Sequence, residues 1–444
     1  MGFKEYTTVH LLFFEKDEPM RILVIGQGGR EHAIIKSLKK SPTVEKIHVI
    51  PGNPGMQREA SCHSLSYDSR SEQDLQKLFD FCKNEKISLV VIGPEDPLVH
   101  GLSDRLREKN ILVFGPSQEA AQLEGSKIFA KQFMNEAGIP TAHYVIVESV
   151  QETLDATIHF TPPYVLKAEG LAAGKGVFIC KDLQELQQSA ELLFDKKIFG
   201  ANGERALLEQ FFSGWEMSFF VFTNGHEYRE LPIAQDHKRL LDQNKGPNTG
   251  GMGTVAPLQI DLQLKEKIIQ QIVEPTVRQL DHHLMIYRGV IFFGLMITPQ
   301  GPLLLEYNTR FGDPETQVLL PLIDGDTATI FYQIAQGLMP EIKINSQCAT
   351  CVIGAAENYP DNPVKGTRIE GDLFHSQPNE YVIAAGVAQQ HDEYVTQGGR
   401  VLGFVGLGST PEESRQRAYA LSQKIHWRGQ QIRQDIGDYQ FQRI

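Results

Sequence analysis

The sequence predicts an α/β protein with three parts: an N-terminal domain on a doubly wound parallel sheet, a central α+β domain with a mobile hairpin, and a small C-terminal domain rich in strands. From Arg21 onward, short apolar runs alternate with stretches of helical length, a pattern typical of parallel sheets. Glycine-containing turns follow these runs, and past about Asn345 the chain changes to short strands and turns. The length of 444 residues suits roughly two to four domains.

The composition is that of an ordinary globular protein, with 41% hydrophobic and 22% charged residues. A formal net charge of −12 argues against wholesale binding of nucleic acid or of an anionic membrane. No apolar run approaches the roughly 18 residues that span a bilayer. The five cysteines show no disulfide framework, so we expect a reducing, cytoplasmic setting. Residues 1–19 precede the first strand and are expected to be an unstructured extension.

The N-terminal domain is expected over residues 20–123. Because ligands bind beyond the carboxyl ends of strands in such sheets, its glycine turns are candidate binding segments. The predicted elements are strands at 22–25, 46–50, 88–92 and 111–114, a turn at 26–33 that opens a helix, and a helix at 74–83.

The central domain is expected over 124–345, with a lid subdomain at about 144–215, and the C-terminal domain over 346–444. Ser126 can N-cap a helix that Gly138 and Pro140 end. Further strands are predicted at 164–167, 176–179, 206–209, 349–355, 381–388 and 401–407, and further helices at 264–284, 328–337 and 410–425.

The most informative segment follows the apolar run 303–305. Glu306 and Asn308 are two residues apart on this strand and therefore point to the same side. A carboxylate and an amide oxygen suit Mg²⁺, which takes few protein oxygens beside phosphates and water. Arg310 follows on that side, and Asp313 and Glu315 come after a turn. The alternative is a buried strand that ends in a solvated polar loop.

A glycine-rich hairpin runs from Lys167 to Lys175 and on to Gly176. Backbone amides without Cβ bulk can approach phosphate oxygens, and the two lysines add charge. The segment is not a Walker A loop, because Gly170–Gly174 is too short and no Ser or Thr follows the second lysine. An ordinary mobile turn is the alternative.

Downstream, Glu209 and Gln210 end a strand, and Phe212 and Glu216 follow. Such a turn can read adenine through its backbone, and a nearby carboxylate can bind ribose hydroxyls, although a plain strand-to-loop transition fits equally well.

The charged run 236–239 lies beside a loop with three glycines in 250–253. This combination indicates close approach to a ligand, with a solvated loop as the alternative.

The turn Gly26-Gln-Gly28-Gly29-Arg30-Glu31 is not a dinucleotide fingerprint. Glu31 stands where the third glycine belongs, and the second strand ends without the acidic ribose ligand. A helix that begins at Gly28 and Gly29 still suits a phosphate, so a sugar phosphate or similar anion is the better expectation.

Taken together, these segments resemble the phosphoribosylamine–glycine ligase family (glycinamide ribonucleotide synthetases) of the ATP-grasp superfamily. The resemblance extends from Met20 to the end, and Gln210, where a second Glu is common, is one departure. The stretches that carry it are GQGGREHA, PGNPG, GPEDPLVHGL, GPSQEAAQLEGSK, KAEGLAAGKGV, AQDHKR, GPNTGGMG, LEYNTRFGDPETQ and GGRVLGFVGLG.

The resemblance implies roles for individual residues. Glu306 and Asn308 would bind Mg²⁺ or Mn²⁺, and Arg310, Lys167 and Asp236 would lie at the chemistry. The ATP-binding residues implied are Lys127, Lys167, Gly174, Lys175, Gly176, Glu209, Gln210, Phe212 and Glu216, and those near the other substrates are Gly28, Gly29, Arg30, Lys238, Gly251 and Asp313.

The reaction implied is ATP-dependent ligation of glycine to 5-phosphoribosylamine through glycyl phosphate, giving glycinamide ribonucleotide in purine biosynthesis. No protein nucleophile is needed, and positioning and charge neutralisation would drive it. The partners expected are the two substrates, without nucleic acid or membrane, and the chain is expected to be a monomer or weak dimer. The alternatives are another ATP-grasp ligase and a nucleotide-binding regulator with an inactive site.

Overall fold

The computed structural model describes residues 19–172 and 176–438, so the prediction for residues 1–19 lies almost wholly outside the described residues. The N-terminal strands are parallel and lie in the order β3-β2-β1-β4-β5. Their bounds are β1 Met20–Gly26, β2 Val44–Pro51, β3 Ser61–Cys62, β4 Leu89–Ile92 and β5 Val113–Pro116.

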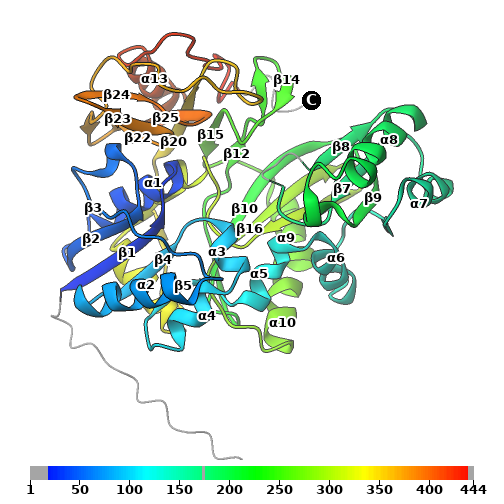
Figure 1. The fold of residues 1–444 in the computed structure, drawn as a ribbon, viewed down its shortest axis with the longest axis horizontal. Coiled ribbons are helices and arrows are strands. Elements are labelled where there is room, and N and C mark those ends of the chain that lie inside the picture. Colours follow the sequence, from blue (N-terminus) through cyan, green and yellow to red (C-terminus); the bar gives the residue numbers. More distant parts are fainter. Residues whose placement is uncertain (1–18, 173–175, 439–444) are drawn as a thin grey trace, which may run out of the picture.

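Helices cover both faces of this sheet, as the doubly wound prediction requires (Figure 1). Val24 of β1 packs with helix α1 (Gly29–Leu38), and its neighbour Leu23 packs with helix α2 (Glu72–Asn84) on the opposite face. The alternation follows from the period of two in a strand. The predicted fold class is confirmed.

The central domain continues the same sheet. β16 (Tyr287–Thr298) pairs antiparallel with β5 and also with β10 (Trp215–Thr223) and β17 (Gly301–Asn308). β11 (Tyr228–Glu230) closes that edge. The end of β17, where Glu306 and Asn308 lie, is therefore fixed relative to the N-terminal turns by a continuous hydrogen-bonded sheet.

A separate four-stranded sheet projects at the right of Figure 1, in the order β6-β9-β7-β8. It occupies the segment predicted as a lid, and helices α7 and α8 pack near it. The bounds are β6 Tyr144–Val147, α7 Val150–Asp155, β7 Tyr164–Ala168, β8 Val177–Cys180, α8 Leu183–Ala190 and β9 Ala206–Gln210.

The C-terminal sheet takes two strands from the central part of the chain. Its order is β12-β15-β20-β25-β22-β21, and β12 (Gln235–Asp236) and β15 (Gly253–Ala256) precede the expected boundary at 345. The domain bounds stay a prediction. The remaining strands are β20 Cys348–Ala355, β21 Ser376–Gln377, β22 Glu380–Ala384 and β25 Arg400–Gly408, with helix α13 Pro411–Ser422 beside them.

Two predicted elements differ in detail. The helix predicted at 264–284 consists of α9 (Leu262–Ile268), a π-helical turn and α10 (Glu274–His282). The strand predicted at 381–388 breaks after β22, because Gly386 packs against the backbone of Gly398. The other elements are α3 Glu95–Val99, α4 Leu102–Arg107, α5 Gln118–Gly125, α6 Lys127–Glu136, β13 Arg239–Leu241, β14 Lys245–Asn248, α11 Thr316–Leu319, β18 Ile323–Asp324, α12 Thr327–Ala335, β19 Lys343–Ile344, β23 Val387–Gln390 and β24 Glu393–Thr396.

In the part of the chain that the structure describes, no helix combines the length and apolar character needed to cross a membrane.

His237 joins the central segment to the end of the described chain. Its Nδ1 lies 3.1 Å from the Gly253 carbonyl, and its Nε2 accepts from the Gly437 amide at 3.4 Å. This pair of partners requires a neutral ring with the proton on Nδ1. Burial and the nearby Arg433 lower the pKa of His237 to about 4.

We predict that His237 makes the protein less stable in acid. Because the folded pKa of about 4 lies below the ordinary value of 6.5, this contribution is complete above pH 6.5 and is lost as the pH falls towards 4. The loss amounts to about 3 kcal/mol of unfolding free energy. Denaturant titrations from pH 7.5 to 5 should show a shallower pH slope for His237→Gln, whose amide can keep both contacts. His226→Gln, at an exposed position, should keep the wild-type slope. Parallel slopes for His237→Gln and wild type would contradict the prediction.

Candidate functional site

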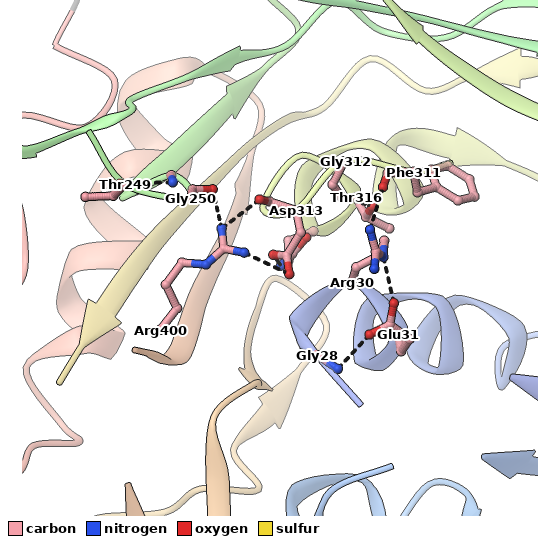
Figure 2. Close-up of polar contacts among 12 residues, drawn as sticks. Gly28, Arg30, Glu31, Thr249, Gly250, Phe311, Gly312, Asp313, Thr316 and Arg400 are labelled. Carbon is pink, nitrogen blue, oxygen red and sulfur yellow. Dashed lines mark hydrogen bonds and ion pairs between the residues drawn. The ribbon is translucent and has the colours of Figure 1, made fainter. Parts of the chain in front are cut away.

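The first glycine turn is filled by the carboxylate of Glu31. Its oxygens accept hydrogen bonds from the Gly28 amide and the Arg30 Nε, each at 2.6 Å (Figure 2). A Cβ on Gly26 would lie 2.6 Å from Glu31, and one on Gly93 would lie 2.0 Å from it. Glu31 therefore packs between the turns after β1 and β4, where only glycines fit. An anion bound at the amide of Gly28 would compete with Glu31, so the predicted phosphate contact there stays a prediction.

Arg310 binds the end of β17 to the N-terminal domain. Its Nη2 lies 2.6 Å from Glu124 at the end of α5, and its Nε lies 3.3 Å from Glu95 at the start of α3. Burial alone would lower the pKa of Arg310, but these two carboxylates raise it above its ordinary value. Burial alone would raise the pKa of Glu95, but Arg310 and Arg30 lower it to about 2.

Glu306 and Asn308 present a carboxylate and an amide oxygen beside several cations. In residues 19–172 and 176–438, the Glu306 carboxylate has no hydrogen bond or salt bridge. Desolvation would raise the pKa of Glu306, but Lys238, Lys167 and Lys127 hold it below its usual range. Asn308 is 8% exposed, and its Oδ1 accepts from the Arg310 Nη2 at 3.0 Å. A carboxylate and an amide oxygen on one strand end fit a hard divalent cation.

The predicted phosphate-binding lysines lie on both sides of the base of the lid sheet. Lys127, the first residue of α6, donates to the Gly170 carbonyl at 3.1 Å, and burial lowers its pKa. Lys167 of β7 pairs with Glu209 of β9 at 2.9 Å. Gly176 is hydrogen-bonded to the Ala168 amide through its carbonyl. Gly174 and Lys175 lie outside the described residues.

The predicted adenine segment lies at the end of β9. The Gln210 side chain is hydrogen-bonded to the backbone of Thr161, through both its oxygen and its nitrogen. The Gln210 amide donates to the His143 carbonyl at 3.0 Å. Phe212 is half-buried in the loop that follows. Glu216, predicted for ribose, forms a 2.9 Å ion pair with Lys238, predicted for the other substrates. That ion pair joins a residue predicted to bind ATP to one predicted to lie near the other substrates.

Asp236 and Glu315 form a pair of like charges. Desolvation and then Glu315 raise the pKa of Asp236 well above its ordinary value. Burial raises the pKa of Glu315, which is 3% exposed and accepts from Ser218 Oγ at 3.2 Å. Gly251 has φ +112°, and a Cβ there would lie 2.6 Å from Asp236 Oδ1. The glycine loop therefore approaches Asp236 closely, whereas the predicted approach to a ligand stays a prediction.

Arg400 brings the C-terminal domain into the site. It starts β25, and its Nη1 donates to the carbonyls of Asp313 at 2.6 Å and Gly250 at 2.5 Å (Figure 2). Its Nη2 lies 3.1 Å from the Asp313 carboxylate. Burial alone would raise the pKa of Asp313, but Arg400 and Arg30 hold it below its usual range. Arg30 itself donates to the Phe311 carbonyl at 3.2 Å.

The structure thus brings the predicted metal pair, the two lysines Lys127 and Lys167, and the segments around Asp236 and Asp313 to one region. Sequence reasoning assigned no role to five charged residues that complete it: Glu31, Glu95, Glu124, Lys131 and Arg400. Each except Lys131 lies in a stretch that carried the family resemblance, which was the signal available.

Comparison with protein families gives three matches in order. The models for the N domain, the ATP-grasp (A) domain and the C domain of phosphoribosylglycinamide synthetase match residues 20–124, 125–316 and 349–439. Together they cover most of the chain.

Individual proteins similar to this chain point to the same family. The phosphoribosylamine–glycine ligase of Caldanaerobacter subterraneus is 40% identical over 94% of this chain and 99% of that protein, and the Vibrio cholerae ligase is 38% identical over 94% and 98%. The crystal structure of the Thermotoga maritima ligase matches with a TM-score of 0.81 and 36% identity, covering 94% of this chain and all of that one. The biotin carboxylase domain of the Hydrogenobacter thermophilus 2-oxoglutarate carboxylase, solved with MgADP and bicarbonate, shares the fold at a TM-score of 0.74 and 17% identity over 94% and 92%. The chain therefore belongs to the phosphoribosylglycinamide synthetase family.

Proposed function

We propose that the protein ligates glycine to 5-phosphoribosylamine with ATP, giving glycinamide ribonucleotide, ADP and phosphate in purine synthesis. The family membership and the names of the relatives support this reaction. The observation that carries it is the position of Glu306, whose carboxylate lies at a sheet end among Lys127, Lys167 and Lys238 and has no hydrogen bond within residues 19–172 and 176–438. Such an arrangement suits a metal-bound triphosphate beside a second, anionic substrate.

The reaction proposed has two steps. A glycine carboxylate oxygen takes the terminal phosphoryl group of ATP, giving glycyl phosphate and ADP. The amine of phosphoribosylamine then attacks the carbonyl carbon, and phosphate leaves with the electron pair of the broken C–O bond. Lys127 and Lys167 neutralise the nucleotide phosphates, and the lid over 170–176 excludes water that would hydrolyse glycyl phosphate.

The donor set at Glu306 and Asn308 fits Mg²⁺ or Mn²⁺. Such an ion, when bound, would neutralise charge on the transferring phosphoryl group. The protein's own part is orientation: Arg310 donates to the Oδ1 of Asn308 and holds that side chain in place.

Asp236 is the proposed acceptor of the proton that the attacking amine releases. Its raised pKa, caused by desolvation and Glu315, makes it a stronger base than an ordinary carboxylate. Because Gly251 has no side chain, the glycine loop can lie close to the Asp236 carboxylate. The residues proposed to contact glycine and phosphoribosylamine are Lys238, Gly28, Gly29, Arg30, Gly251 and Asp313.

The direct test is ADP formation measured with each substrate left out in turn. Release should require glycine and phosphoribosylamine together and should produce glycinamide ribonucleotide in equal amount. ADP formation with a different carboxylate or amine would assign the chain to another ATP-grasp ligation. Nucleotide binding without turnover would indicate a regulator.

We predict that Glu306→Gln abolishes ligation without unfolding the protein. The amide is isosteric but loses the charge that binds the metal, so turnover should fall about 10²-fold or more. Because the carboxylate has no hydrogen bond in the described part of the chain, the melting temperature should stay within a degree or two of wild type. Steady-state rates at saturating Mg²⁺ and a thermal melt test this. Near-normal turnover would refute the metal assignment.

Arg310→Lys should reduce turnover about 10²-fold and also lower stability by about 1–3 kcal/mol. A lysine cannot contact Glu95, Glu124 and Asn308 together, so the buried carboxylates lose hydrogen-bond donors. ADP affinity, measured by calorimetry on the same preparation, should change less than threefold, because the nucleotide lysines are elsewhere. Collapse of ADP affinity together with the rate would place Arg310 in the nucleotide site instead.

Arg400→Lys tests whether the C-terminal domain takes part. The single ammonium cannot contact the carbonyls of Gly250 and Asp313 and the Asp313 carboxylate at once. We expect the KM for phosphoribosylamine or glycine to rise about tenfold, with the KM for ATP nearly unchanged. Arg417→Lys, on the outer helix α13, is the control. An equal rise for ATP would show a general loss of structure.

A further inference from the structure

Lys131 is a buried lysine that the proposed reaction leaves without a role. It lies one turn after Lys127 on α6 and is 2% exposed. Its Nζ donates to Thr141 Oγ1 at 2.7 Å and to the Ala142 carbonyl at 3.4 Å, and lies 3.4 Å from Glu209 Oε1. Burial lowers the pKa of Lys131 to about 8, and Glu209 opposes that effect. Burying an ammonium group is energetically costly, so its position indicates a specific role.

Glu209 is a buried carboxylate between two lysines. It is 2% exposed, and its Oε2 pairs with Lys167 at 2.9 Å. Its Oε1 faces Lys131 but has no hydrogen-bond partner in the described part of the chain. One lysine would neutralise this carboxylate, so the two together leave one positive charge in excess.

The cluster lies where the lid meets the body of the central domain. Lys131 comes from α6 and Glu209 from the lid sheet, which lie together at the right of Figure 1. Thr141, in the segment that enters the lid, donates in turn to the Leu304 carbonyl at 2.7 Å. Leu304 lies on β17, two residues before Glu306. Lys131 thus contacts Glu209 in the lid sheet and also Thr141, whose hydroxyl is hydrogen-bonded to β17.

We propose that Lys131 is a positioning residue that neutralises Glu209 when Lys167 turns to the nucleotide phosphates. The inference rests on the nucleotide site proposed above. Lys167 can bind a phosphate fully only if it releases Glu209, and a buried carboxylate left without a cation is strongly unfavourable. Lys131 provides the replacement, because its ammonium already lies 3.4 Å from the open Oε1 of Glu209. Lys131 therefore affects nucleotide binding without touching the nucleotide.

The test is a double-mutant cycle on ADP affinity, measured by calorimetry with Mg²⁺. The variants are Lys131→Gln, which keeps a donor for Thr141 but loses the charge, Glu209→Gln, and the two combined. Lys131→Gln should weaken ADP binding about tenfold or more, because Glu209 then retains Lys167. In the Glu209→Gln background no carboxylate retains Lys167, so adding Lys131→Gln should change affinity less than threefold.

Two controls separate this role from a structural one. Lys131→Arg keeps the charge and should bind ADP nearly as wild type does. Lys265→Gln removes a lysine from an ion pair with Glu230 outside the cluster and should have no effect. If Lys131→Gln melts far below wild type, Lys131→Met, which fills the same volume, replaces it in the cycle.

Equal ADP affinity of Lys131→Gln and wild type would overturn the inference. So would an equal loss in both backgrounds, which would mean that Lys131 acts on the nucleotide or the fold directly. If wild type itself binds no ADP, the nucleotide site is wrong, and the inference falls with it.

Discussion

The interaction on which the site depends is the clamp of Arg310 between Glu95 and Glu124. These carboxylates belong to the N-terminal domain, whereas Arg310 follows the strand that ends in Glu306 and Asn308. The second oxygen of Glu124 accepts from the amide and hydroxyl of Thr309, so the backbone after β17 is held as well as the guanidinium. The Glu124 side chain is 7% exposed and that of Arg310 is 15% exposed, so removing either leaves the other with a poorly solvated, uncompensated charge. The proposed metal ligands Glu306 and Asn308 and the turn to Asp313 therefore take their positions from this clamp.

The charges divide into two groups with different balances. On the side of the N- and C-terminal domains, carboxylates outnumber the arginines Arg30, Arg310 and Arg400; these carboxylates are Glu31, Glu95, Glu124, Asp236, Asp313 and Glu315. On the nucleotide side, Lys127, Lys131, Lys167 and Lys238 face fewer carboxylates. The protein as a whole carries −12, yet four lysines gathered in one region suit the proposed triphosphate, because nearby charges outweigh distant, screened ones.

Features that depend on residues close together in the sequence could be predicted from it. The period of two in a strand predicted that Glu306 and Asn308 share one side. The glycine spacing predicted close approach to a ligand, and the structure shows Gly251 close to Asp236. The contacts of Glu95, Glu124 and Arg400 could not be predicted, because each joins residues far apart in the sequence and depends on how the domains pack. The pairing of β12 and β15 with the C-terminal sheet could not be predicted either, since short strands carry no signal for their partners.

That shared sheet explains why the C-terminal domain contributes to the site. β15 pairs with β20, and β20 pairs with β25, which starts at Arg400. The glycine loop just before β15 and the arginine at the start of β25 are thus held by one hydrogen-bonded sheet, and Arg400 meets the Gly250 carbonyl. Asp313 lies between Arg400 and the Arg30 that follows the first N-terminal turn. The substrate side of the site is therefore formed only when all three parts of the chain are assembled, so changes in their packing act directly on its geometry.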